Sequence, residues 1–106
     1  MYKGGDHSVA LQKKIQKSNG LILEYHRISM LKIDTNLQCT ILVDSYLNKE
    51  SRLKEKDILR NGVTNDTPLP YVDSEYISFD YDENISIENA YKWLKNQSDF
   101  IGSEDV

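Results

Sequence analysis

Residues 9–47, VALQKKIQKSNGLILEYHRISMLKIDTNLQCTILVDSYL, decide the fold of this 106-residue chain. Two turn signals, Asn19-Gly20 and Thr35-Asn36, divide the stretch into three segments in which apolar residues tend to alternate with polar ones. Asn-Gly suits a two-residue hairpin turn because both residues tolerate positive φ, and the alternation is typical of a half-buried strand. The stretch therefore predicts an antiparallel meander of three strands.

The lengths of the two turns set the expected register of this meander. If the first turn has two residues, Leu11 lies opposite Ile28. If the second also has two, Ile28 lies opposite Val43. By the same count, Met30 lies opposite Ile41. Both registers place apolar residues of all three segments on the same face. A slip of one residue would turn the apolar residues of one strand to the opposite face, so we take the shared apolar face as the core. This face carries Val9, Leu11, Ile15, Ile22, Ile28, Met30, Cys39, Ile41 and Val43.

The opposite face of the predicted meander is only partly polar. An apolar face of this kind is either covered by another part of the chain or left open to bind a partner. Trp93 lies beside the apolar stripe of a helix expected near the C-terminus. Its ring is either packed at the edge of the core or exposed as an anchor for a partner. The candidate partner interface consists of Leu23, Tyr25, Leu31, Leu42, Tyr46 and Trp93.

The rest of the chain predicts one more strand and two helices. Residues 48–60 are polar and favour a short middle helix that ends at Asn61-Gly62. Apolar and polar residues alternate over 76–81, as in a fourth strand. Ser86 is a candidate N-cap for a C-terminal helix, whose apolar stripe would cover the sheet. That stripe consists of Ile87, Ala90, Tyr91 and Leu94.

These segments together predict one α+β domain over residues 9–106. Its expected architecture is an antiparallel β-meander of about four strands, a C-terminal α-helix packed on the sheet and a short middle helix. Residues 1–8 are polar and include adjacent glycines, so we expect a flexible leader or a cloning remnant there.

Composition and charge narrow the classes of partner. The 13 basic and 17 acidic side chains give a formal net charge of −4 and are spread along the chain, which argues against a nucleic-acid partner. Apolar runs fall short of the roughly 18 to 20 residues that cross a bilayer, and the start of the chain lacks the apolar segment of a secretory signal. A single cysteine, Cys39, fits a reducing compartment. We therefore expect a soluble protein without a membrane partner.

No combination of residues predicts a catalytic, cofactor-binding or metal site. His26 lies between polar neighbours and could be considered as a general base. Its neighbours in sequence point to different faces of the strand, so they do not converge on it. Ser45 lies opposite His26 in the expected register. A structural zinc site needs about four Cys or His ligands at regular spacing, and this chain does not offer them. The acidic segment 80–84 lacks the later glycine and glutamate of a calcium loop, with Ile85 and Tyr91 at those positions. We expect a solvated turn there.

Four short segments carry a resemblance to a known group of proteins. They are EYHRI at 24–28, SYLNKESR at 45–52, AYKWLK at 90–95 and FIGSEDV at 100–106. In these segments the chain resembles small proteins encoded near the tail and baseplate genes of Gram-positive bacteriophages and prophages. The group has no settled activity, so the resemblance implies a phage setting and transfers no catalytic residues. The exposed Glu104-Asp105 ending alone lacks an evident packing reason.

The expected function follows from this setting and from the missing chemistry. We expect a non-enzymatic structural or assembly protein of the tail or baseplate module, which acts through contacts with virion proteins or with itself as a homo-oligomer. The alternative is a small phage-encoded inhibitor that binds a host protein, and an enzyme ranks third. The expected locations are the cytoplasm of the bacterial host and the virion.

Overall fold

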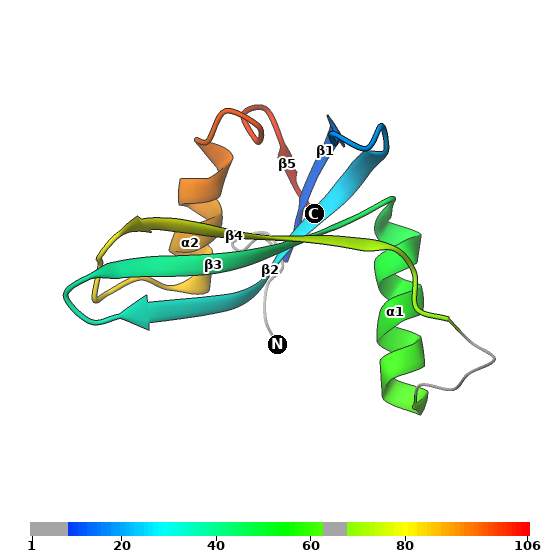
Figure 1. Ribbon diagram of the computed structural model, residues 1–106, viewed down its shortest axis with the longest axis horizontal. Helices are drawn as coiled ribbons and strands as arrows, with labels where there is room; N and C mark the ends of the chain where they lie inside the picture. The colour runs from blue at the N-terminus through cyan, green and yellow to red at the C-terminus, as the bar shows by residue number, and fades with distance from the viewer. Residues whose placement is uncertain (1–8, 63–67) are drawn as a thin grey trace.

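The computed structural model describes residues 9–62 and 68–106, so the expected leader at 1–8 lies outside the described residues. An antiparallel five-stranded sheet and two helices form an α+β domain, which confirms the predicted class (Figure 1). The elements are β1 (Leu11–Gln16), β2 (Ile22–Asp34), β3 (Gln38–Tyr46), α1 (Lys49–Asn61), β4 (Val72–Asp80), α2 (Ile87–Lys95) and β5 (Glu104–Asp105).

The strand order is β4-β3-β2-β1-β5, with one strand more than expected. The extra strand, β5, is the Glu-Asp ending, which pairs with β1 through Leu11 and Gln12. Backbone hydrogen bonds between Ala10 and Val106 extend this pairing, and the carboxylate of Asp105 binds Lys95 Nζ at 2.9 Å. The expectation that the ending has no structural reason is therefore wrong, because it closes one edge of the sheet.

Local capping explains where both helices begin. The side chain of Asn48 accepts a hydrogen bond from Ser51 N at the start of α1, and Ser86 accepts one from Asn89 N at the start of α2, as predicted. Gly62 follows α1 at φ 94°, a conformation that favours glycine, and this confirms the expected end of the helix. The middle helix has 13 residues, the length of the predicted range 48–60 shifted by one position, and it is longer than α2, which has 9.

The first hairpin has a different register from the one predicted. Lys17 N donates to Leu21 O, so the loop has three residues and Gly20 occupies it at φ 90°. An irregularity within β1 shifts the pairing by one more residue. Leu11 consequently lies opposite His26, and the predicted pairing with Ile28 is wrong. Because the two shifts add to an even number, Leu11 still faces the core.

The second hairpin contains two deviations that cancel. Asp34 pairs with Gln38 across a three-residue loop, in which Asn36 has φ 62°. A bulge at Ser29 then takes up the extra residue. Ile28 therefore lies opposite Val43, as predicted.

The bulge exchanges the faces of the two residues that follow it. Leu31 lies opposite Ile41 and packs against the main core, whereas Met30 lies opposite Leu42. The expectation that Met30 belongs to the core face and Leu31 to the other face is therefore wrong. A one-residue bulge reverses side-chain direction while leaving the apolar pattern of the sequence unchanged.

The main core lies between the sheet and α2. It confirms the expected covering of the sheet by the C-terminal helix, through Ala90, Tyr91 and Leu94. Two residues assigned to the core are exposed instead: Val9 lies before β1 and Ile22 at the start of β2, with 63% and 51% of their surface exposed. The buried residues of this cluster are Leu11, Ile28, Ile41, Val43, Ala90, Tyr91, Leu94 and Phe100.

A second, smaller core occupies one end of the sheet. It contains Ala10, Tyr25 and Tyr46, with Val72 packed against them. Helix α1 packs beside β2 and β3 there, and Tyr46 donates a hydrogen bond of 2.7 Å to Glu55 on that helix. The two helices thus lie at different ends of the sheet, α2 to the left and α1 to the right in Figure 1.

Candidate interaction surface

Three of the residues predicted for a partner interface are buried within the chain itself. Leu23 and Tyr46 have no exposed surface and Tyr25 has 6%. The rings of Tyr25 and Tyr46 meet edge to face at 6.2 Å. The expectation of an open surface at these three positions is wrong. For the two tyrosines the reason is tertiary, because the small core and α1 cover them.

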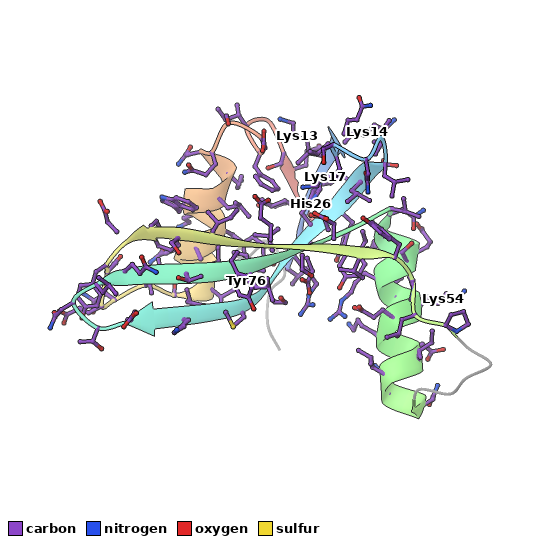
Figure 2. All side chains as sticks on the ribbon, in the orientation of Figure 1. Lys13, Lys14, Lys17, His26, Lys54 and Tyr76 are labelled. Atoms are coloured by element: carbon purple, nitrogen blue, oxygen red, sulfur yellow. The ribbon has the colours of Figure 1, made fainter. Side chains whose placement is uncertain are left out.

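Beyond α1, the same side of the sheet is open. The row Leu31–Ile41–Ile77 packs on the main core, so the adjacent row Met30–Leu42–Tyr76 points to the opposite side. Tyr76 is the most exposed of the second row, at 68%, while Met30 and Leu42 are half-buried. Figure 2 labels Tyr76 on the part of the sheet between the two helices. We define the open face as Met30, Thr40, Leu42, Tyr76 and Ser78.

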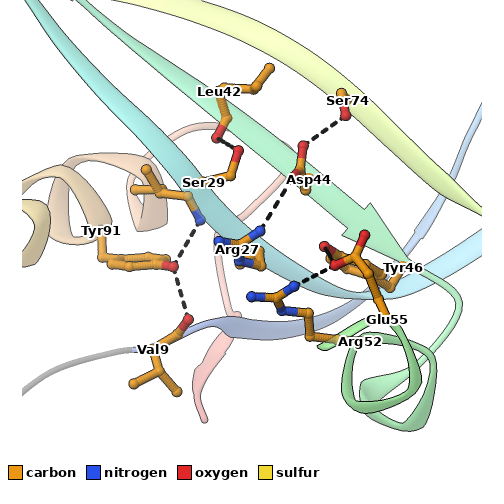
Figure 3. A network of polar contacts seen from close by, with 11 residues as sticks. Val9, Arg27, Ser29, Leu42, Asp44, Tyr46, Arg52, Glu55, Ser74 and Tyr91 are labelled. Carbon is orange, nitrogen blue, oxygen red and sulfur yellow. Dashed lines mark hydrogen bonds and ion pairs between the residues drawn. The ribbon is translucent and has the colours of Figure 1, made fainter. Parts of the chain in front are cut away.

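Polar contacts border this row on both sides. On one side, the hydroxyl oxygens of Thr40 and Ser78 lie 2.9 Å apart. On the other, Asp44 accepts hydrogen bonds from Ser74 Oγ at 2.7 Å and from Arg27 at 3.4 Å (Figure 3). The open face therefore has an apolar centre with hydrogen-bonded polar groups around it, an arrangement typical of protein interfaces.

The polar network in Figure 3 also fixes α1 against the sheet. Glu55 accepts hydrogen bonds from Tyr46 and from Arg52, both of which are mostly buried. Burial and the hydrogen bond to Glu55 raise the pKa of Tyr46 to about 12. The phenol is consequently a neutral donor at ordinary pH, and it holds the helix at the boundary of the open face.

A basic cleft of about 430 Å³ lies beside this network. Arg27 and Arg52 line it together with Lys56, and the rings of Tyr25 and Tyr91 form part of its wall. Burial raises the pKa values of both tyrosines. Both arginines are engaged by carboxylates of the chain, Asp44 and Glu55. The charges of the two arginines in the cleft are thus balanced by carboxylates of the chain itself.

Trp93 lines a different cleft, of about 750 Å³, near the end of β4. Its ring stacks on Phe79 with centroids 4.4 Å apart, and it packs against the main core while remaining half-buried. Of the two roles considered for Trp93, the structure thus shows edge packing. Because the main core lies on the other side of the sheet from the open face, Trp93 does not join the open face.

His26 and Ser45 form a buried pair, opposite one another as the sequence predicted. Nε2 of His26 lies 2.8 Å from Lys13 O, and Nδ1 lies 2.8 Å from Ser45 Oγ. A carbonyl only accepts, so Nε2 carries the hydrogen and Nδ1 accepts from the serine. Burial lowers the pKa of His26. Both nitrogens are therefore used in holding β1 and β3 to β2.

The described residues contain no group of three or more His, Cys, Asp or Glu that could hold a metal ion. Within the acidic segment 80–84, Asp82 Oδ1 accepts from Asn84 N at 2.9 Å, and Asp82 O accepts a hydrogen bond from Ile85 N. These contacts form the turn that was expected there.

Of the predicted interface residues, only Leu42 lies on the open face. Sequence reasoning missed Tyr76 and Met30. A signal for Tyr76 was present in the alternation predicted over 76–81, because Tyr76 alternates with Ile77 and Phe79, which pack against the main core. Met30 carried no such signal because the bulge at Ser29 decides its direction.

Comparisons with protein-family models, with curated proteins and with solved structures found no match to this chain. Among the helices that the structure describes, none is long and apolar enough to cross a membrane.

Proposed function

We propose that this protein is a non-enzymatic assembly protein of a bacteriophage or prophage tail module and that it binds a protein partner through the open face. The observation that carries the proposal is the cross-strand row Met30–Leu42–Tyr76, which lies opposite the core and is not covered by either helix. Apolar side chains on a rigid sheet can be buried by a partner without first being ordered.

The composition of the open face favours a protein as the ligand. Tyrosine contributes a large contact area with few rotatable bonds, and it is enriched among residues that dominate binding. Leu42 and Met30 extend this contact area, and the polar pair Thr40–Ser78 supplies hydrogen-bonding groups at its border. A partner with an apolar patch and a hydrogen-bonding rim would fit this surface.

Two further arguments support the phage setting and the non-enzymatic role. The resemblance of residues 24–28, 45–52, 90–95 and 100–106 to proteins encoded near tail genes supports the setting. The burial of His26 and Ser45, with both ring nitrogens engaged, supports a structural use of the one histidine that invites a catalytic interpretation.

The test combines virion composition with a variant of the open face. In the phage or prophage that encodes the chain, the wild-type protein or its direct binding partner should be found in purified tails by mass spectrometry. Leu42→Asp should assemble or bind at a small fraction of the wild-type level, because it places a charge in the apolar centre. Leu59→Asp, on an exposed position of α1, is the matched control.

Normal assembly with Leu42→Asp would contradict the proposed surface. A protein that is made early and binds a host protein, with tails that assemble normally in its absence, would favour the inhibitor alternative. Either result separates the open face from the phage setting, because the variant tests the first and virion composition tests the second.

A further inference from the structure

Strand β4 lies at the end of the strand order, so within residues 9–62 and 68–106 one side of its backbone has no neighbouring strand. It has nine residues and pairs with β3 throughout without a register shift. Along its length Ser74, Glu75, Tyr76, Ser78 and Asp80 are exposed. A long, regular edge of this kind offers a row of N–H and C=O groups to another strand.

The other edges of the sheet are less suited to pairing. Strand β5 has only two residues. The part of β2 after His26 also lacks a β1 partner. This part contains the bulge at Ser29, and bulges twist an edge away from further strands. In this part of β2, the backbone N–H of Ile28 donates to Tyr91 Oη at 2.8 Å, so one donor of the edge is already occupied. Strand β4 is therefore the edge on which an added strand fits best.

Carboxylates on β4 restrict how a second copy of the strand could pair with it. A two-fold axis perpendicular to the sheet keeps each side chain on its own face, so the axis must pass beside one residue. Centred on Glu75, the axis would set that carboxylate opposite itself. Centred on Ser74, it would set Asp73 opposite Glu75. Centred on Ile77, it would pair residues 74–80 only. Like charges directly opposite one another destabilise a strand pair.

An axis beside Tyr76 avoids these conflicts. It pairs all nine residues, and each carboxylate then faces a neutral side chain of the second copy. Asp73 faces Phe79, Glu75 faces Ile77, and Asp80 faces Val72. Tyr76 faces Tyr76 of the second copy, which forms an aromatic cross-strand pair.

We propose that two copies of this chain pair antiparallel through their β4 strands, with Tyr76 opposite Tyr76 of the second copy. The dimer is a continuous ten-stranded sheet. The rows Met30–Leu42–Tyr76 of both copies join across the two-fold axis, and the two open faces become one surface. The pairing uses the edge of β4 and does not depend on the partner proposed for the open face.

Sedimentation equilibrium of the full chain over a dilution series tests the association. Wild type should form a concentration-dependent dimer. Tyr76→Glu should weaken dimerisation about tenfold or more, because it removes the aromatic pair and sets two carboxylates opposite one another. Leu59→Glu, which adds the same charge on α1, should leave the dimer unchanged. A wild type that stays monomeric at every concentration would overturn the proposal.

Cysteine cross-linking tests the register independently of any loss of association. With a short bismaleimide, Tyr76→Cys should give a covalent dimer. Ser74→Cys alone should not, since the two thiols would be displaced by about 13 Å along the strands. A mixture of Ser74→Cys with Ser78→Cys should cross-link, because these positions face each other. The unmodified chain is the control, as its Cys39 is buried.

Cross-linking of Ser74→Cys alone in preference to Tyr76→Cys would overturn the proposed register. Failure of the proposed function gives a different pattern. In that case Leu42→Asp would leave partner binding unchanged while the dimer and its cross-links persist.

Discussion

Ser45 on β3 donates its hydroxyl hydrogen to Nδ1 of His26 on β2, at 2.8 Å and with both side chains buried. Because Nε2 is already committed to Lys13 O, the imidazole has one tautomer that satisfies all three groups. The pair thus joins three neighbouring strands at the point where β1 departs from regular pairing.

Ser45→Ala should lower the free energy of unfolding by about 1 to 3 kcal/mol, because it leaves a buried acceptor on His26 without a donor. The tautomer cannot reverse to compensate, since Lys13 O requires the hydrogen on Nε2. Urea unfolding followed by circular dichroism measures the change. Ser18→Ala, in the exposed first turn, is the control and should change stability by less than about 0.5 kcal/mol. Equal losses in both variants would contradict the buried pair.

Acid should destabilise the protein through His26. Burial lowers its pKa from the ordinary value of 6.5, so the unfolded chain binds a proton at a pH where the folded chain does not. The contribution is complete above pH 6.5 and is lost as the pH falls from there through the folded pKa. The free energy of unfolding, measured between about pH 7.5 and 5.0, should fall less steeply for His26→Gln than for wild type. The same slope in both proteins would contradict the assignment.

Tyr46 should titrate late. Its folded pKa of about 12 lies above the ordinary 10.0, so its stabilising effect is complete below pH 10 and is lost as the pH rises through about 12. Absorbance of tyrosinate should show that the late part of the wild-type titration loses one tyrosine in Tyr46→Phe, while the buried Tyr25 and Tyr91 still titrate above the ordinary value. A late step that persists unchanged in Tyr46→Phe would assign it to another tyrosine.

Leu94→Ala should cost about 2 to 4 kcal/mol, because Leu94 has no exposed surface and lies in the main core. Lys92→Ala on the same helix removes a side chain that is 69% exposed and ion-paired with Glu88 at 3.7 Å, so it should cost less than about 0.5 kcal/mol. The midpoints of urea unfolding compare the two. Equal midpoints for Leu94→Ala and wild type would show that α2 does not pack on the sheet.

Turns, caps and alternation are local signals, and they predicted four of the five strands and both helices, although β4 begins at Val72 rather than at Tyr76. It did not determine the register, since a third loop residue or a bulge adds one position without altering the apolar pattern. At Ser29 and the second loop the two effects cancel, which preserved the pairing of Ile28 with Val43. In the first hairpin the three-residue loop and the irregularity between Gln12 and Ile15 shift the pairing in the same direction, so the predicted partner of Leu11 was wrong.

The candidate surface was harder to predict than the fold. Tyr25 and Tyr76 look alike in sequence, because each is a tyrosine in an alternating strand. Only the packing of α1 and the small core buries the first and leaves the second open. Strand β5 was missed because two acidic residues carry no apolar pattern, and their pairing depends on the outer edge of β1.

The hydrogen bonds between Ala10 and Val106 also decide how the molecule can be tethered. A linker attached before Ala10 or after Val106 would leave from the β1–β5 edge, whereas β4 forms the other end of the strand order. A molecule anchored to a chip or fused to a carrier after Val106 would therefore be held at the end of the strand order opposite to β4. For binding measurements, attachment at this end is the choice that keeps the support out of line with the pairing proposed for β4.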